Sequence, residues 1–454
     1  MIRKKGLVIL SILSLALFNA SQVWSNVSEF TLDNGLKLIV KEDHRAPVVV
    51  SQIWYRVGSS YEYNGLTGVS HQLEHMMFKG TKTHGPNVFS QRIARLGGKE
   101  NAFTGRDYTA YFQRLEKRHL AVSFELESDR MKNLLLDNQE FIKERKVIAE
   151  ERRMRTDDKP TSLTYEQFTA TAFVNSPYHH PVIGWMEDIH SLDMADLQLW
   201  YRLWYSPNNA IVVVAGDVDP HAVYQLAKRY YGPLSANPVV PPKPQREIPQ
   251  RGSRHIVVKA AAKVPYLLLG YPVPSLKSAL DDEKIPDWEP YALEVLAYII
   301  DGGDSARLTR KLIRQTKIAT STSVGYDLYA RLQSLFTLSA TPVSGTDIPT
   351  LKNALLAEIQ RVRNTRVSPT ELLRVKAQVT ASQVYEQDSL FYQAMLLGRL
   401  ETVGIGWQSH DQFVEKVTAV TAEQIQKVAR KYLLDDKLTI AELDPQPLSA
   451  GDKP

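Results

Sequence analysis

The chain has 454 residues, which is too many for one ordinary hydrophobic core and predicts two domains of roughly 200 residues each. Its composition, 43% hydrophobic and 23% charged, is that of a soluble globular protein. The formal net charge of +5 falls to +2 without the three N-terminal charges of Arg3, Lys4 and Lys5. So small an excess gives no reason to expect a nucleic-acid partner.

The first 25 residues have the pattern of an export signal. Arg3-Lys4-Lys5 is basic, Leu7 to Phe18 is an apolar core too short for an ordinary spanning helix, and Val23-Trp24-Ser25 resembles a cleavage site. The chain has no cysteine, which excludes disulfides and a lipid-bearing cysteine. An exported chain without disulfides indicates the periplasm of a Gram-negative bacterium. An uncleaved N-terminus that anchors the chain in the inner membrane is the alternative.

The most informative segment is His71-Gln72-Leu73-Glu74-His75. The apolar residues in and around it fall within about 100° of arc on a helical wheel, whereas His71, Glu74 and His75 fall on the far side. Residues four apart lie about 40° apart around a helix, so both imidazoles can reach one metal ion while Glu74 holds a water beside it. This arrangement predicts a zinc peptidase site. A solvated helix face that carries two histidines is the alternative.

The next two informative segments predict a strand and a helix. Residues 100–112 alternate and favour β-structure. Residues 139–152 predict a charged helix on which Glu144 and Glu151, seven residues apart, point the same way, whereas Glu150 is turned about 100° from Glu151. These glutamates are candidates for a third metal ligand. The alternative is a salt-bridged face exposed to solvent.

A proline-rich stretch and a weak internal repeat predict the domain organisation. Frequent proline makes residues 232–252 a linker, after an export signal at 1–25 and a first domain at 26–231 and before a second domain at 253–454. In the first half a helix around 197–202 leads into a strand at 210–214, and in the second half a helix at 422–432 leads into a strand at 437–441. The predicted class is α+β, with two homologous domains that each have an antiparallel sheet and helices packed on one face.

At this point the chain resembles the inverted-motif zinc peptidases typified by pitrilysin, insulin-degrading enzyme and the mitochondrial processing peptidase. That family has a His-x-x-Glu-His motif, a ligand Glu about 76 residues later and another Glu seven residues before that ligand. Here the distance from His75 selects Glu151 as the ligand and Glu144 as the second glutamate. Further matching segments cover nearly the whole chain after residue 25, at His75–Thr81, Gly97–Thr104, Tyr205–Ala210 and Gly302–Leu308.

The resemblance implies one Zn²⁺ per chain, bound by His71, His75 and Glu151. Such a ligand set leaves one position open, where a water has its pKa lowered toward about 7. Glu74 would be the general base that takes the proton of this water and passes it to the leaving amine. Glu144 would orient His75 or hold the water. The implied activity is that of a zinc metalloendopeptidase.

In similar enzymes the strand that matches residues 100–112 is an edge to which the peptide substrate adds as one more strand, so Asn101 and Ala102 are substrate-binding candidates. The chain departs from the family in its second half. Self-sufficient members have an Arg followed about seven residues later by a Tyr, which stabilise substrate and oxyanion. Arg314 matches the Arg, but Thr320 or Ser321 stands where the Tyr would be.

This departure predicts that the chain is the zinc-bearing subunit of a two-chain enzyme. Its partner would be a homologous subunit without zinc that carries the Arg and Tyr. A homodimer is the second arrangement. The missing Tyr also favours a different class of function, a catalytically silent scaffold in a periplasmic complex, whereas the complete ligand set favours the peptidase.

Overall fold

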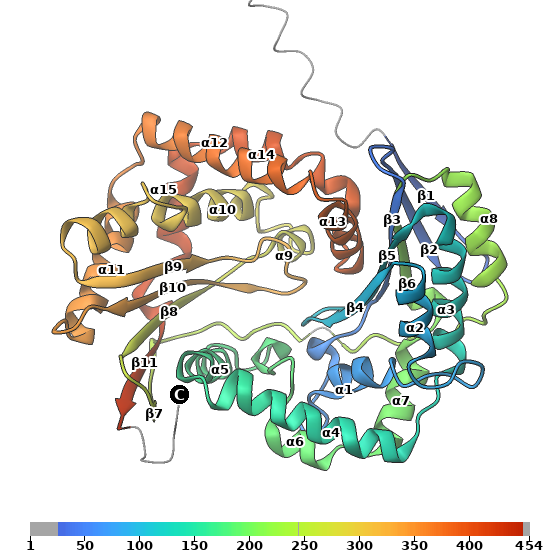
Figure 1. Ribbon diagram of the computed structural model, residues 1–454. Helices are drawn as coiled ribbons and strands as arrows, with labels where there is room; N and C mark the ends of the chain where they lie inside the picture. Colours follow the sequence, from blue (N-terminus) through green and yellow to red (C-terminus); the bar gives the residue numbers. More distant parts are fainter. Residues whose placement is uncertain (1–25, 244, 448–454) are drawn as a thin grey trace, which may run out of the picture.

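The computed structural model describes residues 26–243 and 245–447, and the predicted export signal lies outside these ranges. Two β-sheets stand side by side with helices around them (Figure 1). The first sheet has the strand order β1-β2-β6-β3-β5-β4, and the second has the order β7-β11-β8-β10-β9. The strands are β1 (Val27–Thr31), β2 (Lys37–Glu42), β3 (Val48–Tyr55), β4 (Lys99–Thr104), β5 (Thr109–Glu116), β6 (Ala210–Gly216), β7 (Arg254–Ala261), β8 (Tyr266–Val273), β9 (Ala319–Gly325), β10 (Ser334–Pro342) and β11 (Thr439–Gln446).

The helices follow the same division between the two halves. Those of the first half are α1 (Val69–Met76), α2 (Val88–Arg95), α3 (Leu120–Asn133), α4 (Asn138–Arg152), α5 (Pro160–Ala172), α6 (Met186–Ser191), α7 (Met194–Trp204) and α8 (Pro220–Tyr230). Those of the second half are α9 (Leu276–Leu280), α10 (Trp288–Asp301), α11 (Ile348–Asn364), α12 (Pro369–Glu386), α13 (Leu390–Thr402), α14 (Phe413–Ala419) and α15 (Ala422–Tyr432). In the part of the chain that the structure describes, no helix is long and apolar enough to cross a membrane.

The α+β class is confirmed, but each sheet contains one parallel pair where an antiparallel sheet was expected. β6 lies between β2 and β3, and β11 lies between β7 and β8. In both cases the flanking strands are consecutive in the chain and run in opposite directions, so a strand inserted between them must be parallel to one. β6 is parallel to β2, and β11 is parallel to β7. The predicted helix and strand repeat therefore occupies the same place in both sheets, as α7 with β6 and as α15 with β11.

The segment that was expected to form one strand, residues 100–112, is a hairpin of β4 and β5. The N–H of Gly105 donates to the carbonyl of Tyr108 at 2.8 Å and closes a turn at residues 105–108. Gly105 and Asp107 are residue types that favour a chain reversal. The alternating residues before and after them led to the prediction of one continuous strand. As a result β4 pairs only with β5 and forms an edge of the first sheet.

The two halves exchange helices. One face of the first sheet packs on helices of its own half, including α3 and α8, while α13 from the second half covers the other face. In return, α5 from the first half packs on β7, β8 and β11 (Figure 1). Both contacts require a glycine at the point of closest approach. A Cβ at Gly398 would overlap the indole of Trp54, and a Cβ at Gly270 would overlap the ring of Phe168. Each sheet is thus completed by a helix of the other half.

The segment that connects the two halves is held in place by hydrogen bonds. Residues 233–243 and 245–251 form no helix or strand. The carboxylate of Glu247 accepts backbone N–H bonds from Val174, Asn175 and Ser176 at 2.8 to 3.0 Å. This part of the segment is therefore fixed to the first half.

A buried polar network joins the halves at the turn of the β4–β5 hairpin. Asp107, only 5% exposed, accepts hydrogen bonds from Ser60 Oγ at 2.8 Å and from Tyr178 OH at 2.5 Å. Arg331 of the second half donates to the same carboxylate through its backbone N–H at 3.2 Å and its Nε at 3.1 Å. Its guanidinium also lies over the ring of Tyr61, 4.4 Å from the centroid. We call this set of contacts the Asp107 network.

Asp107→Asn is expected to lower the free energy of unfolding by about 2 kcal/mol, because it removes the charge that a largely buried arginine is paired with. The side chain of Arg331 is 22% exposed, which places the effect below that of a fully buried pair. Urea unfolding followed by tryptophan fluorescence measures the change. Asp304→Asn is the control, since Asp304 is exposed and its ion pair is with Arg314, which is also exposed. Equal unfolding midpoints for the two variants would contradict the expectation.

Candidate metal centre

Helix α1 is positioned by a glycine and a buried carboxylate at its N-terminus. Gly68 has φ +86°, and a Cβ there would collide with the backbone of Ile183 and Gly184. The carboxylate of Glu62 accepts the N–H groups of Gly68 and Ser70, both at 2.8 Å. Burial raises the pKa of Glu62 to about 7, although these hydrogen bonds oppose the shift. Glu62 thus fixes the start of the helix that carries the His-x-x-Glu-His motif.

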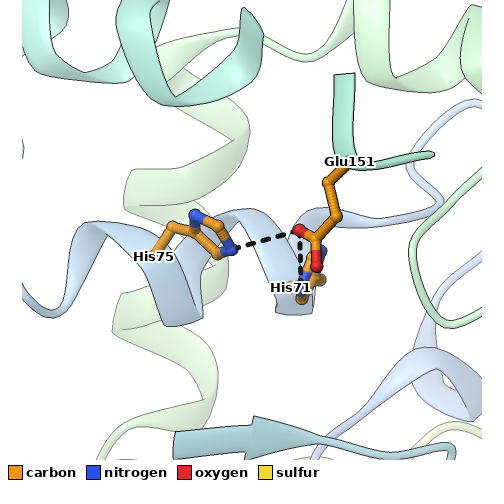
Figure 2. A group of neighbouring side chains, drawn as sticks. All are labelled: His71, His75 and Glu151. Atoms are coloured by element: carbon orange, nitrogen blue, oxygen red, sulfur yellow. Dashed lines mark ion pairs between the residues drawn. The ribbon is translucent and has the colours of Figure 1, made fainter. Parts of the chain in front are cut away.

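The apolar side of α1 packs into the first core, and its polar side meets the end of α4. Nε2 of His71 lies 3.7 Å from a carboxylate oxygen of Glu151, and Nε2 of His75 lies 3.6 Å from the same oxygen. Figure 2 shows the three side chains pointing toward one another. Ligand atoms about 2.0 to 2.2 Å from a tetrahedral Zn²⁺ are roughly 3.3 to 3.6 Å apart, so the observed distances of 3.6 and 3.7 Å lie at the upper end of this range and just above it. Within the described residues, no second group of this kind is found.

The protonation state of His71 favours metal binding. Burial, together with the nearby His75 and Arg155, lowers the pKa of His71 to about 3, so its imidazole is neutral at ordinary pH. Neutral imidazole is the form of histidine that binds a metal. Two imidazoles and one carboxylate are a ligand set of catalytic zinc sites, so the residues present fit the ion.

Glu144 holds one of the two histidines in orientation. One of its carboxylate oxygens lies 3.0 Å from Nδ1 of His75, on the side of the ring away from Glu151, and the other lies 2.5 Å from Nζ of Lys79. Burial alone would raise the pKa of Glu144, but the contacts with Lys79 and His75 outweigh it and lower the pKa. A carboxylate on the outer nitrogen of a metal-binding histidine fixes its tautomer and orientation.

Glu144→Gln is expected to weaken zinc binding by about 10 to 100-fold, the usual effect of losing such a carboxylate. Competition against a chromophoric zinc chelator gives the affinity. Glu150→Gln, on the same helix α4 at an exposed residue that pairs with Arg153, is the matched control and should bind zinc as the unchanged chain does. An affinity in Glu144→Gln equal to that of the control would show that His75 needs no such partner.

Glu74, the predicted general base, lies beside the three donor residues and is not one of them. A carboxylate oxygen of Glu74 accepts a hydrogen bond from Thr104 Oγ1 at 2.5 Å. Burial raises the pKa of Glu74, and the bond from Thr104 and the charge of His75 offset only part of the shift. The Thr104 contact joins α1 to the edge strand β4. Glu74 is therefore held between the donor residues and that edge.

A cavity of about 880 Å³ contains these groups. His71, Glu74, His75 and Glu151 line it together with residues of β4, of α5 and of the segment that precedes α5. Asn101 and Ala102, the predicted substrate-binding residues, are part of its wall. The N–H of Ala102 donates to the side-chain oxygen of Asn101 at 2.9 Å and therefore faces away from β5, toward the open edge. Arg314 does not line this cavity, and its guanidinium lies 3.0 Å from Asp304.

Four residues around the centre, Glu62, Lys79, Thr104 and Arg155, were not predicted to have a role, although Lys79 and Thr104 lie in segments that match the family. Arg155 contacts Glu151 at 2.8 Å. Arg155 lies four residues after Glu151, so helical spacing could have identified it. Lys79 lies beyond the end of α1 and reaches Glu144 on α4, a contact between separate segments that spacing does not predict. Glu62 and Thr104 reach α1 across loops and the sheet edge, and no local pattern points to them.

Comparison with known proteins agrees with the motifs. Residues 37–184 match the family described as insulinase (peptidase family M16), and residues 191–379 match the peptidase M16 inactive domain. The zinc protease PqqE of Helicobacter pylori is 30% identical over 419 residues, which cover 91% of this chain and 92% of the relative. The chain belongs to the M16 peptidase family. This confirms the resemblance, and the donor residues His71, His75 and Glu151 lie inside the region of the insulinase match.

Further similar proteins extend the comparison. The uncharacterized zinc protease YmxG of Bacillus subtilis is 23% identical and covers 90% of this chain and 96% of its own length. A crystal structure of a protease from Helicobacter pylori superposes with a TM-score of 0.86 at 30% identity, covering 92% of this chain and 99% of that one. The periplasmic protease PqqL of Escherichia coli shares the fold, with a TM-score of 0.75 at 19% identity. The match covers 94% of this chain but 49% of PqqL.

Proposed function

We propose that this M16 chain is a zinc-dependent endopeptidase that hydrolyses peptides or unfolded segments. The observation that carries the proposal is the convergence of His71, His75 and Glu151 on one point of a cavity that also contains Glu74 and an open strand edge. The curated relatives are named zinc proteases, which supports the same reaction.

The roles of the residues follow from their positions. His71, His75 and Glu151 would hold the ion, which when bound supplies a Lewis acid and a water of lowered pKa. Glu74 takes the proton of the attacking water and passes it to the leaving amine. Thr104 keeps the Glu74 carboxylate turned toward the edge strand. Glu144, in contact with Nδ1 of His75, fixes the orientation of that ring.

The substrate would bind as an additional strand on β4. β4 is an edge of its sheet, and the N–H of Ala102 faces that edge. A peptide carbonyl that replaces the Asn101 side chain on this N–H would pair through its main chain, a mode of binding that makes little demand on sequence. A folded protein has few free strands to offer, so peptides and unfolded segments are the proposed substrates.

The chain would act with a second, homologous subunit that lacks zinc and carries the Arg and Tyr pair. Thr320 and Ser321 stand where the Tyr would be, and Arg314 is paired with Asp304 away from the cavity. PqqL is about twice the length of the matched region, so a second half accompanies the matched one in that protein. A homodimer is the second arrangement. Export to the periplasm is part of the proposal, supported by the N-terminal pattern and by the description of PqqL as periplasmic.

Hydrolysis of a quenched, unstructured peptide tests the proposal. The mature chain is assayed alone and mixed with a homologous non-zinc subunit from the same organism, each after removal of metal and after addition of zinc. Zinc-restored cleavage that needs the second subunit is the expected result. Cleavage by the chain alone would favour the homodimer. Absence of zinc-dependent cleavage in both mixtures would overturn the peptidase and favour the silent scaffold.

A further inference from the structure

The backbone of Arg106 is fixed by hydrogen bonds just after the edge strand β4. It lies in the turn of the β4–β5 hairpin and lines the cavity that contains the metal centre. Its carbonyl accepts the N–H of Ser60 at 2.7 Å, and the turn is closed by the bond between Gly105 and Tyr108. The backbone that carries this side chain is therefore held on both sides of the turn.

The guanidinium of Arg106 is also held in place. It lies over the ring of Tyr178, 5.2 Å from the centroid. Tyr178 is buried, and its hydroxyl is bonded to Asp107. A guanidinium stacked on a fixed aromatic ring loses less freedom on binding a ligand than one on a free side chain.

Arg106 nevertheless has no carboxylate partner. Its neighbour Asp107 is turned toward Ser60, Tyr178 and Arg331 by the Asp107 network. The cavity glutamates are engaged elsewhere, Glu74 with Thr104, Glu151 with Arg155 and the histidines, and Glu166 with Arg152. In residues 26–243 and 245–447, no carboxylate forms an ion pair with Arg106. The other cavity arginine, Arg155, pairs with Glu151 at 2.8 Å.

We propose that Arg106 is a specificity-determining residue that binds a carboxylate of the peptide substrate. The carboxylate belongs to an Asp or Glu side chain or to the C-terminus of the peptide. Thr104, two residues earlier, is bonded to Glu74, so Arg106 meets the substrate about two to three residues from the bond that is cleaved, at roughly 3.3 Å per strand residue. This inference rests on the proposed peptidase function and names the substrate chemistry of the same cavity.

Paired peptides test Arg106 in the assay described above. One series replaces Gln by Glu at single positions on either side of the scissile bond, and a second compares a free C-terminus with an amide. The ratio of kcat/KM for the charged and neutral member of each pair is the readout, because general damage to the enzyme lowers both. For the unchanged enzyme we expect about a tenfold preference for the charged member at one position or in the C-terminal pair, the effect of one charge-assisted hydrogen bond.

Arg106→Gln should bring that ratio to about one, and Arg106→Lys should retain part of it, since a lysine keeps the charge without the fork of donors. Arg118→Gln is the matched control, because Arg118 is exposed, pairs with Glu116 and lies outside the cavity. The series in which the preference disappears identifies the source of the carboxylate. No preference in the unchanged enzyme, or the same preference in Arg106→Gln, would overturn the inference.

A binding assay distinguishes a failure of this inference from a failure of the proposed peptidase function. Fluorescence anisotropy of the same labelled peptides on zinc-loaded Glu74→Gln, with and without Arg106→Gln, measures recognition without hydrolysis. Tighter binding of the charged peptide that is lost with Arg106→Gln supports the inference even if the enzyme cleaves no peptide. Equal affinity for both members of every pair would overturn it.

Discussion

Glu74→Gln is expected to lower kcat for peptide hydrolysis about a thousandfold while the chain keeps its zinc, since general base catalysis contributes on the order of 10² to 10⁴. Glutamine has nearly the same shape as glutamate and can still accept the bond from Thr104. It cannot take a proton from water. The substitution is therefore expected to remove proton transfer while the structure and the metal binding are kept. Peptide hydrolysis and zinc content are measured on the same preparation.

Glu150→Gln is the matched control for this loss. It makes the same substitution on α4 at a side chain that is 60% exposed and pairs with Arg153. The control should keep its activity. If Glu74→Gln were to retain more than about a tenth of the activity, Glu74 would not be the base.

Glu151→Gln is expected to weaken zinc binding by more than about a hundredfold, beyond the effect of residues that only orient a ligand. The neutral amide would leave two imidazoles and no anionic ligand, and Arg155 would lose the carboxylate that it pairs with. Zinc content after dialysis against a weak chelator gives the loss. Zinc should raise the melting temperature of the unchanged chain and leave that of Glu151→Gln unchanged, because only binding to the folded state stabilises it.

Glu150→Gln again provides the comparison, here as the adjacent glutamate on the same helix. It should bind zinc as the unchanged chain does. A loss of zinc in Glu150→Gln with retention in Glu151→Gln would reverse the ligand assignment.

The arrangement of the side chains within each metal-site segment could be predicted because it depends on helical spacing. Four-residue spacing places His71 and His75 together, and seven-residue spacing places Glu144 and Glu151 on one side of α4. In the structure Glu144 contacts His75, Glu151 lies near both histidines, and Glu150 points to solvent. Spacing alone left Glu150, Glu144 and Glu151 as candidates, and the choice of Glu151 came from the family resemblance.

Other features depend on contacts between distant segments, and the sequence had no local signal for them. Glu62 reaches the start of α1 across a loop, and Thr104 reaches Glu74 from the sheet edge. The Asp107 network joins residues more than 200 positions apart. The parallel pairs arise because β6 and β11 insert between earlier strands, a choice that strand propensity does not encode.

The exchange of α5 and α13 determines how the polypeptide could be divided. Residues 26–231 alone would carry α5 without the sheet it covers and would expose the face of their own sheet that contains Trp54. Exposed apolar faces of this kind favour aggregation. Neither half is therefore expected to fold as a stable unit by itself. A single backbone cleavage between residues 238 and 243 would instead give two polypeptides that stay associated as a noncovalent complex, because α5 and α13 each pack on the sheet of the other fragment.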